Sequence, residues 1–369
     1  MNVPFFDYKY TFTSEEDDLL ELIRDAGRRG AFIQQSDLED FEHELARFIG
    51  SPFTVGVANA TDGLMMALMA GGIGPGDEVI FCSHTMVATA SAIHFTGATP
   101  VPVEAGSDHL MDVGSIEAAI TPRTKVIMPT QLNGRTADMD AIGSIAREHG
   151  LQIYEDAAQA LGSQFKNQMA GTFGEAACIS FYPAKLLGCL GDGGAVLCRS
   201  KDIYTKLLLL RDHGRADAGG GDVELWGFNS RLDNIQAAVL SYRLKKIDSI
   251  IERRRQIARI YKKRLADLDE LVLPPGPDGD DDHFDVFQNY EIEAQRRDAL
   301  KDNLAQNSVG TLIQWGGKPV HQFKKLGFTD DLPVTDSLFK RMLMLPMNLS
   351  VRDEELEYIC DLIHDFYRS

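Results

Sequence analysis

The stretch Cys178-Ile179-Ser180-Phe181-Tyr182-Pro183-Ala184-Lys185 begins as a short apolar run and ends in a lysine, and a glycine-rich segment over residues 188–194 follows it. Six other apolar runs of similar length lie between residues 55 and 200, and helical patterns fill the gaps between them. The runs cover residues 55–57, 78–81, 99–103, 125–129, 151–154 and 195–198. This alternation predicts an α/β fold in which helices cover both faces of a mostly parallel sheet.

The pattern changes in the last third of the chain. Residues 232–267 are helical in pattern, and a turn-rich, acidic segment over 274–282 follows. The sequence then predicts a strand over 284–292, a helix over 297–306, a short strand over 310–314 and a last helix over 353–367. We therefore expect a large domain over residues 1–240, which starts with helices at 14–30 and 37–49, and a smaller α+β domain over residues 241–369. Glycine and acidic residues at 216–222 predict a mobile loop.

The composition limits the class of partner. The 369 residues include 37 basic and 55 acidic side chains, which gives a formal net charge of −18. Nucleic acids and anionic membranes attract basic surfaces, so neither is an expected partner. The five cysteines include no C-x-x-C pair and the nine histidines no H-x-x-x-H spacing. We therefore expect no metal site, reduced thiols and a cytoplasmic location. No apolar stretch is long enough to span a bilayer.

Polar groups follow two of the apolar runs, at the strand ends where ligands of parallel sheets bind. Asp156 follows the run 151–154, Ser180 lies near the end of the run 178–181, and Lys185 follows that run. A lysine for a Schiff base, a carboxylate for the pyridine nitrogen and a hydroxyl for phosphate are what pyridoxal phosphate (PLP) requires. The alternatives are a helix-capping Asp156 and a surface Lys185. The apolar residues that flank Lys185 favour a partly desolvated amine, which loses its proton more easily.

The segment Asn59-Ala60-Thr61-Asp62 ends a predicted strand and opens a predicted helix. Free N–H groups at a helix start bind phosphate well, but Thr61 or Asp62 could equally be an ordinary helix cap. In combination with Ser180, the phosphate interpretation is favoured.

Several further motifs give the sequence a resemblance to a known family. They are Gly74-Pro75-Gly76-Asp77-Glu78-Val79-Ile80, Thr85-Met86-Val87-Ala88-Thr89, Thr96-Gly97-Ala98-Thr99-Pro100, Ala119-Ile120-Thr121-Pro122-Arg123-Thr124-Lys125, Ala137-Asp138-Met139-Asp140 and Asn229-Ser230-Arg231-Leu232-Asp233. With the segments around Asp156 and Lys185, their order and spacing resemble the DegT/DnrJ/EryC1/StrS family of PLP-dependent sugar aminotransferases, from about residue 14 to the C-terminus. The resemblance implies a type I aminotransferase fold and a homodimer with active sites at the subunit interface.

The resemblance also implies roles for individual residues. Lys185 would form the covalent link to PLP, Asp156 would face the pyridine nitrogen, and Gln159 would lie near the ring hydroxyl. The implied phosphate contacts are Thr61, Asp62 and Ser180 of one subunit and Asn229 of the other. The implied sugar contacts, for which packing is the alternative, are Trp315, Lys318 and His321.

Three positions depart from the family pattern. Ala60 replaces a glycine, His84 stands where we expect the aromatic residue that stacks on the PLP ring, and Gln131-Leu132-Asn133-Gly134 replaces His-Leu-Tyr-Gly. An imidazole can stack, so we expect His84 to contact the cofactor.

The implied reaction is a ping-pong transamination. An amino group passes from L-glutamate to a nucleotide-linked keto-sugar, and the amino sugar serves a surface polysaccharide such as lipopolysaccharide O-antigen, or a secondary metabolite. Two alternatives stay open: a sugar dehydratase of the same family, which carries histidine where Lys185 stands, and a non-catalytic regulatory protein. A Rossmann dehydrogenase is disfavoured because no G-x-G-x-x-G follows the first strand.

Overall fold

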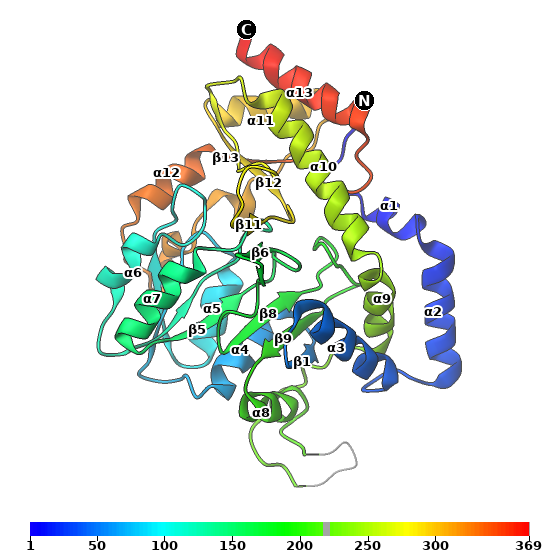
Figure 1. Ribbon diagram of the computed structural model, residues 1–369, viewed down its shortest axis with the longest axis vertical. Helices are drawn as coiled ribbons and strands as arrows, with labels where there is room; N and C mark the ends of the chain where they lie inside the picture. The colour runs from blue at the N-terminus through cyan, green and yellow to red at the C-terminus, as the bar shows by residue number, and fades with distance from the viewer. Residues whose placement is uncertain (217–221, 369) are drawn as a thin grey trace.

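The structure is a computed structural model that describes residues 1–216 and 222–368 (Figure 1). Residues 217–221, which form most of the predicted mobile loop, and Ser369 lie outside the described residues. A seven-stranded sheet forms the centre of the molecule. From edge to edge its strands are β1 (Phe53–Val57), β9 (Gly194–Cys198), β8 (Ala176–Ser180), β5 (Gln152–Asp156), β4 (Thr124–Met128), β2 (Glu78–Cys82) and β3 (Thr99–Val103).

Most neighbouring strands of this sheet are parallel. The parallel pairs are β2 with β3, β2 with β4, β4 with β5, and β5 with β8. Strand β9 is the exception, because it runs antiparallel to both β8 and β1. The carboxyl ends of the other strands therefore meet at one edge of the sheet, where ligands bind in folds of this kind. The predicted α/β fold with a mostly parallel sheet is confirmed.

Helices cover both faces of the sheet, because alternate residues of a buried strand point to opposite sides (Figure 1). In β2, Val79 and Phe81 pack on one side and Ile80 and Cys82 on the other. The first side is covered by α4 (Ala60–Ala70), α5 (Val87–Phe95) and α8 (Lys201–Arg211). The second side is covered by α3 (Ser36–Ile49), α6 (Val113–Ala119), α7 (Met139–His149), α9 (Asn234–Leu244) and α12 (Pro333–Arg341).

A smaller antiparallel sheet lies above the central sheet in Figure 1. Its strands are β10 (Leu271–Val272), β12 (Tyr290–Ala294) and β13 (Met342–Leu345). Its apolar core includes residues of α10 (Ile247–Leu265), α11 (Arg297–Gln306) and α13 (Asp353–Arg368). The remaining elements are α1 (Tyr8–Thr13), α2 (Glu16–Arg29), the short sheet of β6 (Gln164–Phe165), β7 (Gln168–Met169) and β11 (His283–Phe284), and the 3₁₀ helices η1 (Gln314–Gly317), η2 (Val320–Gln322) and η3 (Lys324–Leu326).

The C-terminal third differs from its sequence prediction in three places. The helical pattern over 232–267 forms two helices, α9 and α10, which are separated at Lys245 and Lys246. The predicted strand 284–292 is divided between β11 and β12, with Phe287 between them at a positive φ of 52°. The predicted strand 310–314 is wrong, because Leu312 makes only an isolated bridge to Met344 before η1 begins.

The predicted boundary between the two domains, at residues 240/241, stays a prediction, and this point lies within α9. Within the described ranges, no helix combines the length and apolar character that crossing a membrane requires.

Candidate active site

A cavity of about 420 Å³ opens at the carboxyl edge of the central sheet. Segments that follow β1, β2 and β4 line it, as do the last residues of β5 and β8. Gln288, Asn289 and Met344, which lie next to or within strands of the smaller sheet, close the opposite side. The cavity therefore lies between the two sheets, at the strand ends where the sequence places its polar motifs.

Lys185 faces this cavity and is partly buried. Burial lowers the pKa of its amine to about 8, although the charge of Asp156 acts in the opposite direction. Gln288 holds the chain on both sides of the lysine: its Nε2 donates to the carbonyl oxygen of Ala184 (2.8 Å), and its Oε1 accepts from the N–H of Leu186 (2.7 Å). The amine is thus on a fixed support and is a usable nucleophile near neutral pH. Gln288 could not be found from the sequence, because it lies 104 residues from Ala184 and 102 residues from Leu186.

Asp156 ends β5 as a buried carboxylate on the same cavity. It accepts hydrogen bonds from Thr89 Oγ1 (2.6 Å) and from the N–H of Ala158 (3.2 Å). Burial raises its pKa, while these two bonds and the charge of Lys185 act in the opposite direction. A buried carboxylate with so few partners favours a cationic ligand group beside it.

The start of α4 forms another part of the cavity. Thr61 lines it, as does Ser180 at the end of β8. Asp62 does not line the cavity: its carboxylate accepts a hydrogen bond from Ser230 Oγ (2.8 Å), and its N–H donates to Asn59 Oδ1 (2.9 Å). A Cβ on Gly194 would come within 2.8 Å of the Asn59 carbonyl carbon, so glycine allows β9 to pass close to this turn.

Four side-chain amides, from Asn133, Gln159, Asn289 and Gln314, form a group that we call the amide cluster. Gln159 Oε1 accepts from the N–H of Asn133 (2.9 Å) and from Asn289 Nδ2 (3.2 Å). Asn133 Oδ1 accepts from Asn289 Nδ2 (2.8 Å) and from Gln314 Nε2 (2.9 Å). Gln159, Asn289 and Gln314 line the cavity. Of these three residues, the sequence predicts only Gln159 as a site residue, because Asn289 and Gln314 reach it through contacts between distant parts of the chain.

His84 is not among the residues that line the cavity, and Thr85 and Met86 line it instead. The His84 side chain is fully buried. Its Nδ1 donates to the carbonyl oxygen of His109 (2.9 Å), and its ring packs edge-on against Phe339 and Trp315. The structure therefore places His84 behind the cavity lining, and the side chain of Met86, two residues later, lines the cavity.

The three predicted sugar contacts are separated. Trp315 lines the cavity, whereas Lys318 is exposed and outside its lining. His321 is buried, with Nδ1 bonded to Ser83 Oγ (2.8 Å) and Nε2 lying 3.0 Å from Asp336 Oδ1. His321 thus fastens its own segment to the end of β2. Asn229 is exposed and lies outside the cavity lining, so its predicted role depends on a second subunit.

The sequence profile of the DegT/DnrJ/EryC1/StrS aminotransferase family matches residues 13–364. The chain belongs to this family. The resemblance found from the motifs is therefore confirmed, and the protein is a PLP-dependent aminotransferase.

Individual relatives cover almost the whole chain. A UDP-N-acetyl-3-dehydro-alpha-D-glucosamine 3-aminotransferase from Acidithiobacillus ferrooxidans is 39% identical over 98% of this chain and 97% of its own length. A pleiotropic regulatory protein from Geobacillus stearothermophilus is 35% identical over 100% of this chain and 99% of its own length. The crystal structure of DesV from S. venezuelae, in complex with a ketimine intermediate, has a TM-score of 0.95 at 37% identity and covers 100% of this chain and 99% of that one.

The cavity of this DegT/DnrJ/EryC1/StrS family member fits PLP in its donor set. Lys185 supplies an amine whose pKa is lowered by burial, and Asp156 supplies a buried carboxylate for a protonated ring nitrogen. Thr61 at the start of α4 and Ser180 at the end of β8 supply hydroxyls, and phosphate binds favourably at a helix start. Gly194 allows close backbone approach at this turn.

Proposed function

We propose that this aminotransferase moves an amino group from L-glutamate to a nucleotide-linked keto-sugar. The observation that carries the proposal is that Lys185 and Asp156 line one cavity, the lysine with a pKa lowered to about 8. The relative from Acidithiobacillus ferrooxidans, whose name specifies a UDP-linked 3-keto sugar, supports the substrate class.

Lys185 and Asp156 divide the proton handling between them. When bound, PLP supplies an electron sink for the negative charge that forms at the α-carbon of the amino donor. Asp156 keeps the pyridine nitrogen protonated, which its position in the buried end of β5 suits. Lys185 Nζ takes the proton from the α-carbon of glutamate, and in the second half-reaction delivers a proton to the sugar carbon that receives nitrogen. An amine with a pKa of about 8 is well matched to this work at neutral pH.

Thr61 and Ser180 hold the phosphate in this proposal, and the role of Asp62 is indirect. The bond from Ser230 to the Asp62 carboxylate (2.8 Å) fixes the residue that follows Asn229. Asn229 is exposed and is thereby presented to the phosphate of a second subunit. Exposed apolar side chains support a homodimer: Met86 is 54% and Tyr182 49% exposed at the cavity, and Trp226 is 95% exposed three residues before Asn229.

Trp315 and the amide cluster contact the sugar. Trp315 is the predicted sugar contact that lines the cavity, and the amides beside it supply the neutral donors and acceptors that sugar hydroxyls require. Lys318 is exposed, so it reaches only a part of the substrate that extends out of the cavity, such as a nucleotide phosphate. His321 supports this segment from beneath through Ser83 and Asp336.

Two alternative functions that the sequence leaves open have to be compared with the proposed transamination. A sugar dehydratase of this family would carry histidine at position 185, where this chain has lysine. A regulatory role matches the name of the Geobacillus stearothermophilus relative. Retention of Lys185, Asp156 and Ser180 on one cavity supports catalysis instead.

The test is the visible absorbance spectrum of the purified protein with PLP, recorded before and after addition of L-glutamate. We expect the natural protein to show a visible absorbance band that glutamate removes. We expect Lys185→Ala to show neither this band nor a change on addition of glutamate. Lys201→Ala, which removes an exposed lysine at the start of α8, is the matched control and should behave as the natural protein. A band that glutamate leaves unchanged would favour another donor or the dehydratase, and absence of any band would favour the regulatory protein.

The expected product is an amino sugar for a surface polysaccharide, O-antigen or secondary metabolite, made in the cytoplasm. All five cysteines are buried and unpaired, which supports a reducing compartment.

A further inference from the structure

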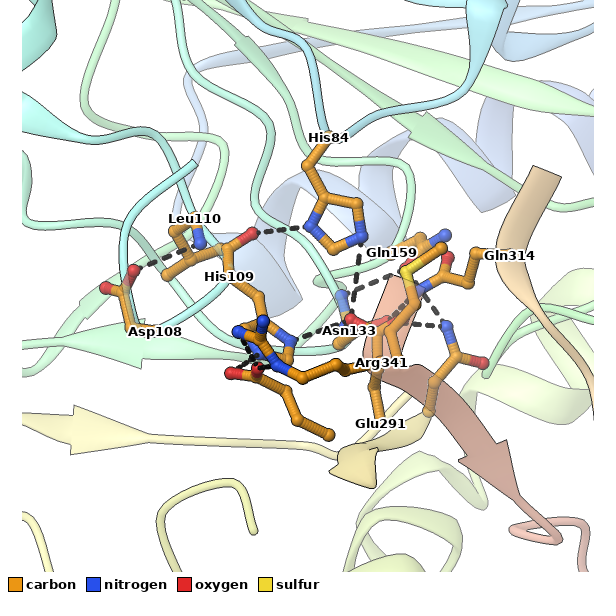
Figure 2. A network of polar contacts seen from close by, with 12 residues as sticks. His84, Asp108, His109, Leu110, Asn133, Gln159, Glu291, Gln314 and Arg341 are labelled. Carbon is orange, nitrogen blue, oxygen red and sulfur yellow. Dashed lines mark hydrogen bonds and ion pairs between the residues drawn. The ribbon is translucent and has the colours of Figure 1, made fainter. Parts of the chain in front are cut away.

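Glu291 is a buried carboxylate beside the active site that the proposed mechanism does not use. It lies in β12, and its side chain is only 1% exposed. Figure 2 shows it between residues from separate parts of the chain: Asn133 Nδ2 donates to its Oε1 (3.1 Å), Gln314 Nε2 donates to its Oε2 (2.7 Å), and His109 Nδ1 lies 2.8 Å from Oε1. A buried charge is costly, so a carboxylate in this place needs a reason.

A carboxylate can only accept hydrogen bonds, and this fixes the orientation of the amides around it. The atoms of Asn133 and Gln314 that contact Glu291 must be nitrogens. Asn133 must therefore turn its oxygen the other way, and that oxygen accepts from Asn289 Nδ2 (2.8 Å). With an uncharged, two-sided amide at position 291, either orientation of Asn133 would be possible.

The orientation of Asn289 in turn affects Gln159, whose oxygen also accepts from a backbone N–H. Asn289 Nδ2 also donates to Gln159 Oε1 (3.2 Å), and the N–H of Asn133 donates to the same oxygen (2.9 Å). Since the oxygen of Gln159 is occupied within the protein, its NH2 group is the part left to face the cavity. A donor at that position suits an anionic oxygen of a ligand ring.

Residues outside the cavity lining balance the charge of Glu291. Burial lowers the pKa of His109, but the hydrogen bonds to Glu291 and Glu293 outweigh the effect of burial and raise this pKa to about 9. Glu293 is in turn bonded to Arg341 Nε (2.7 Å), as Figure 2 shows for Arg341. The remaining neighbour, His84, has Nε2 3.5 Å from Glu291 Oε1, and burial lowers its pKa. Glu291 is thus ionised at neutral pH and serves the amides as an acceptor.

We propose that Glu291 is a positioning residue for the transamination: it fixes the amides of Asn133 and Asn289 so that the NH2 group of Gln159 faces the ring oxygen of PLP. This inference rests on the proposed function, since it requires PLP bound through Lys185 with its ring oxygen near Gln159.

The test is the pH titration of the visible absorbance of PLP-loaded protein. A hydrogen bond donated to the ring oxygen weakens the hold of that oxygen on the neighbouring proton, so loss of the donor raises the titration midpoint. Gln159→Leu removes the donor itself and should therefore show the full rise in the titration midpoint. We expect Glu291→Gln to raise the midpoint by about half to one pH unit, the size of one hydrogen bond. Mere removal of a negative charge would lower the midpoint, which separates the two explanations by sign.

Glu293→Gln is the matched control. It makes the same chemical change next to the same histidine, but Glu293 is bonded to His109 and Arg341 and not to Asn133 or Gln314. We expect it to leave the midpoint unchanged or to lower it. We also expect Glu291→Gln to add nothing in a Gln159→Leu background, because both changes act on one hydrogen bond.

Asn289→Leu provides a second way to interrupt the same path if Glu291→Gln does not fold, and it should raise the midpoint as well. A normal or lowered midpoint in Glu291→Gln, with a raised midpoint in Gln159→Leu, would overturn the proposal. So would full additivity of the two changes. Failure of the proposed function itself would appear earlier and separately, as natural protein without a PLP band that depends on Lys185.

Discussion

Asp156 shows how a single residue can be suited to catalysis at the expense of stability. Its carboxylate is buried, and only Thr89 and the N–H of Ala158 donate hydrogen bonds to it. Burial raises its pKa, so its charged form is disfavoured unless a positive group lies beside it. A protonated pyridine nitrogen is such a group, and PLP should therefore stabilise the folded protein by more than its contact area suggests.

Replacing Asp156 by asparagine separates the contribution of this residue to catalysis from its effect on stability. The amide keeps the size of the side chain but cannot hold a proton on the ring nitrogen, so we expect turnover to fall by about 10²-fold or more. The unfolding midpoint without PLP should stay equal or rise, because a buried charge has been removed. Steady-state kinetics and thermal unfolding with and without PLP check both parts. Undiminished turnover would contradict the role of Asp156, and Asp202→Asn on the exposed start of α8 controls for the loss of charge.

The sequence identified Lys185, Asp156, Thr61 and Ser180 as cavity residues, because each lies at or just after a strand end. The contact of His84 with the cofactor, which the family resemblance implies, stays a prediction, and His84 does not line the cavity. The side chain turns into the protein to meet His109, and Met86 reaches the cavity instead. Such a difference depends on which way a side chain points in an irregular segment, and no periodic pattern encodes that.

At the scale of elements, two ion pairs of His109 join the segment after β3 to β12. Glu291 and Glu293 of β12 both bond to the ring of His109, at 2.8 and 3.3 Å. The pKa of His109 is raised from 6.5 to about 9 in the folded protein. A raised pKa means that the protonated form is stabilised by folding.

We therefore expect His109→Gln to lower the free energy of unfolding by up to about 3 kcal/mol near neutral pH. The contribution of His109 is fully present below pH 6.5, is lost as the pH rises to about 9, and is absent above it. Urea unfolding of both proteins at several pH values measures this difference, which should vanish at high pH. His149→Gln, in which an exposed histidine is changed, should show no such difference. A constant difference at all pH values would mean that His109 acts by packing and not by charge.

Elements with a clear internal pattern could be predicted, and elements defined by distant partners could not. The predicted helices at 14–30 and 37–49 correspond to α2 and α3, since their apolar spacing is visible locally. Nothing in the residues of β9 shows that it runs antiparallel to β8, because direction is set by the path of residues 181–193 between the two strands. Residues 310–314 have an apolar pattern, but the β-bridge that this segment forms is limited to Leu312 and its partner Met344.

At the scale of the whole molecule, the active site joins segments that lie far apart in the sequence. Phe6 and Met344 line the same cavity. The amide cluster and Glu291 bring together positions 133, 159, 289, 291 and 314. None of these contacts is local, so a single sequence could indicate the chemistry of the site but not the network that supports it. The same limit applies to Asn229, whose predicted partner is in another subunit.

Mixing two defective variants tests that partnership. Lys185→Ala removes the reacting amine, and Asn229→Ala removes the predicted contact to the phosphate of the other subunit. In a mixed dimer of the two variants, one site keeps both groups and the other loses both. Because random exchange makes about half of the dimers mixed, we expect about a quarter of the natural number of intact sites. Turnover of the mixture should exceed that of either variant alone.

The measurement is transamination activity and PLP content after the two variants are unfolded together and refolded, compared with the variants refolded separately. Lys185→Ala mixed with Asp156→Asn is the matched control. Both of its changes lie on the cavity of one chain, so a mixed dimer in that case has no intact site, whichever subunit supplies Asn229. Equal recovery in both mixtures would mean that activity comes from something other than shared sites. No recovery in the Asn229 mixture, with dimers shown to form, would mean that Asn229 does not act across the subunit interface and would overturn its predicted role.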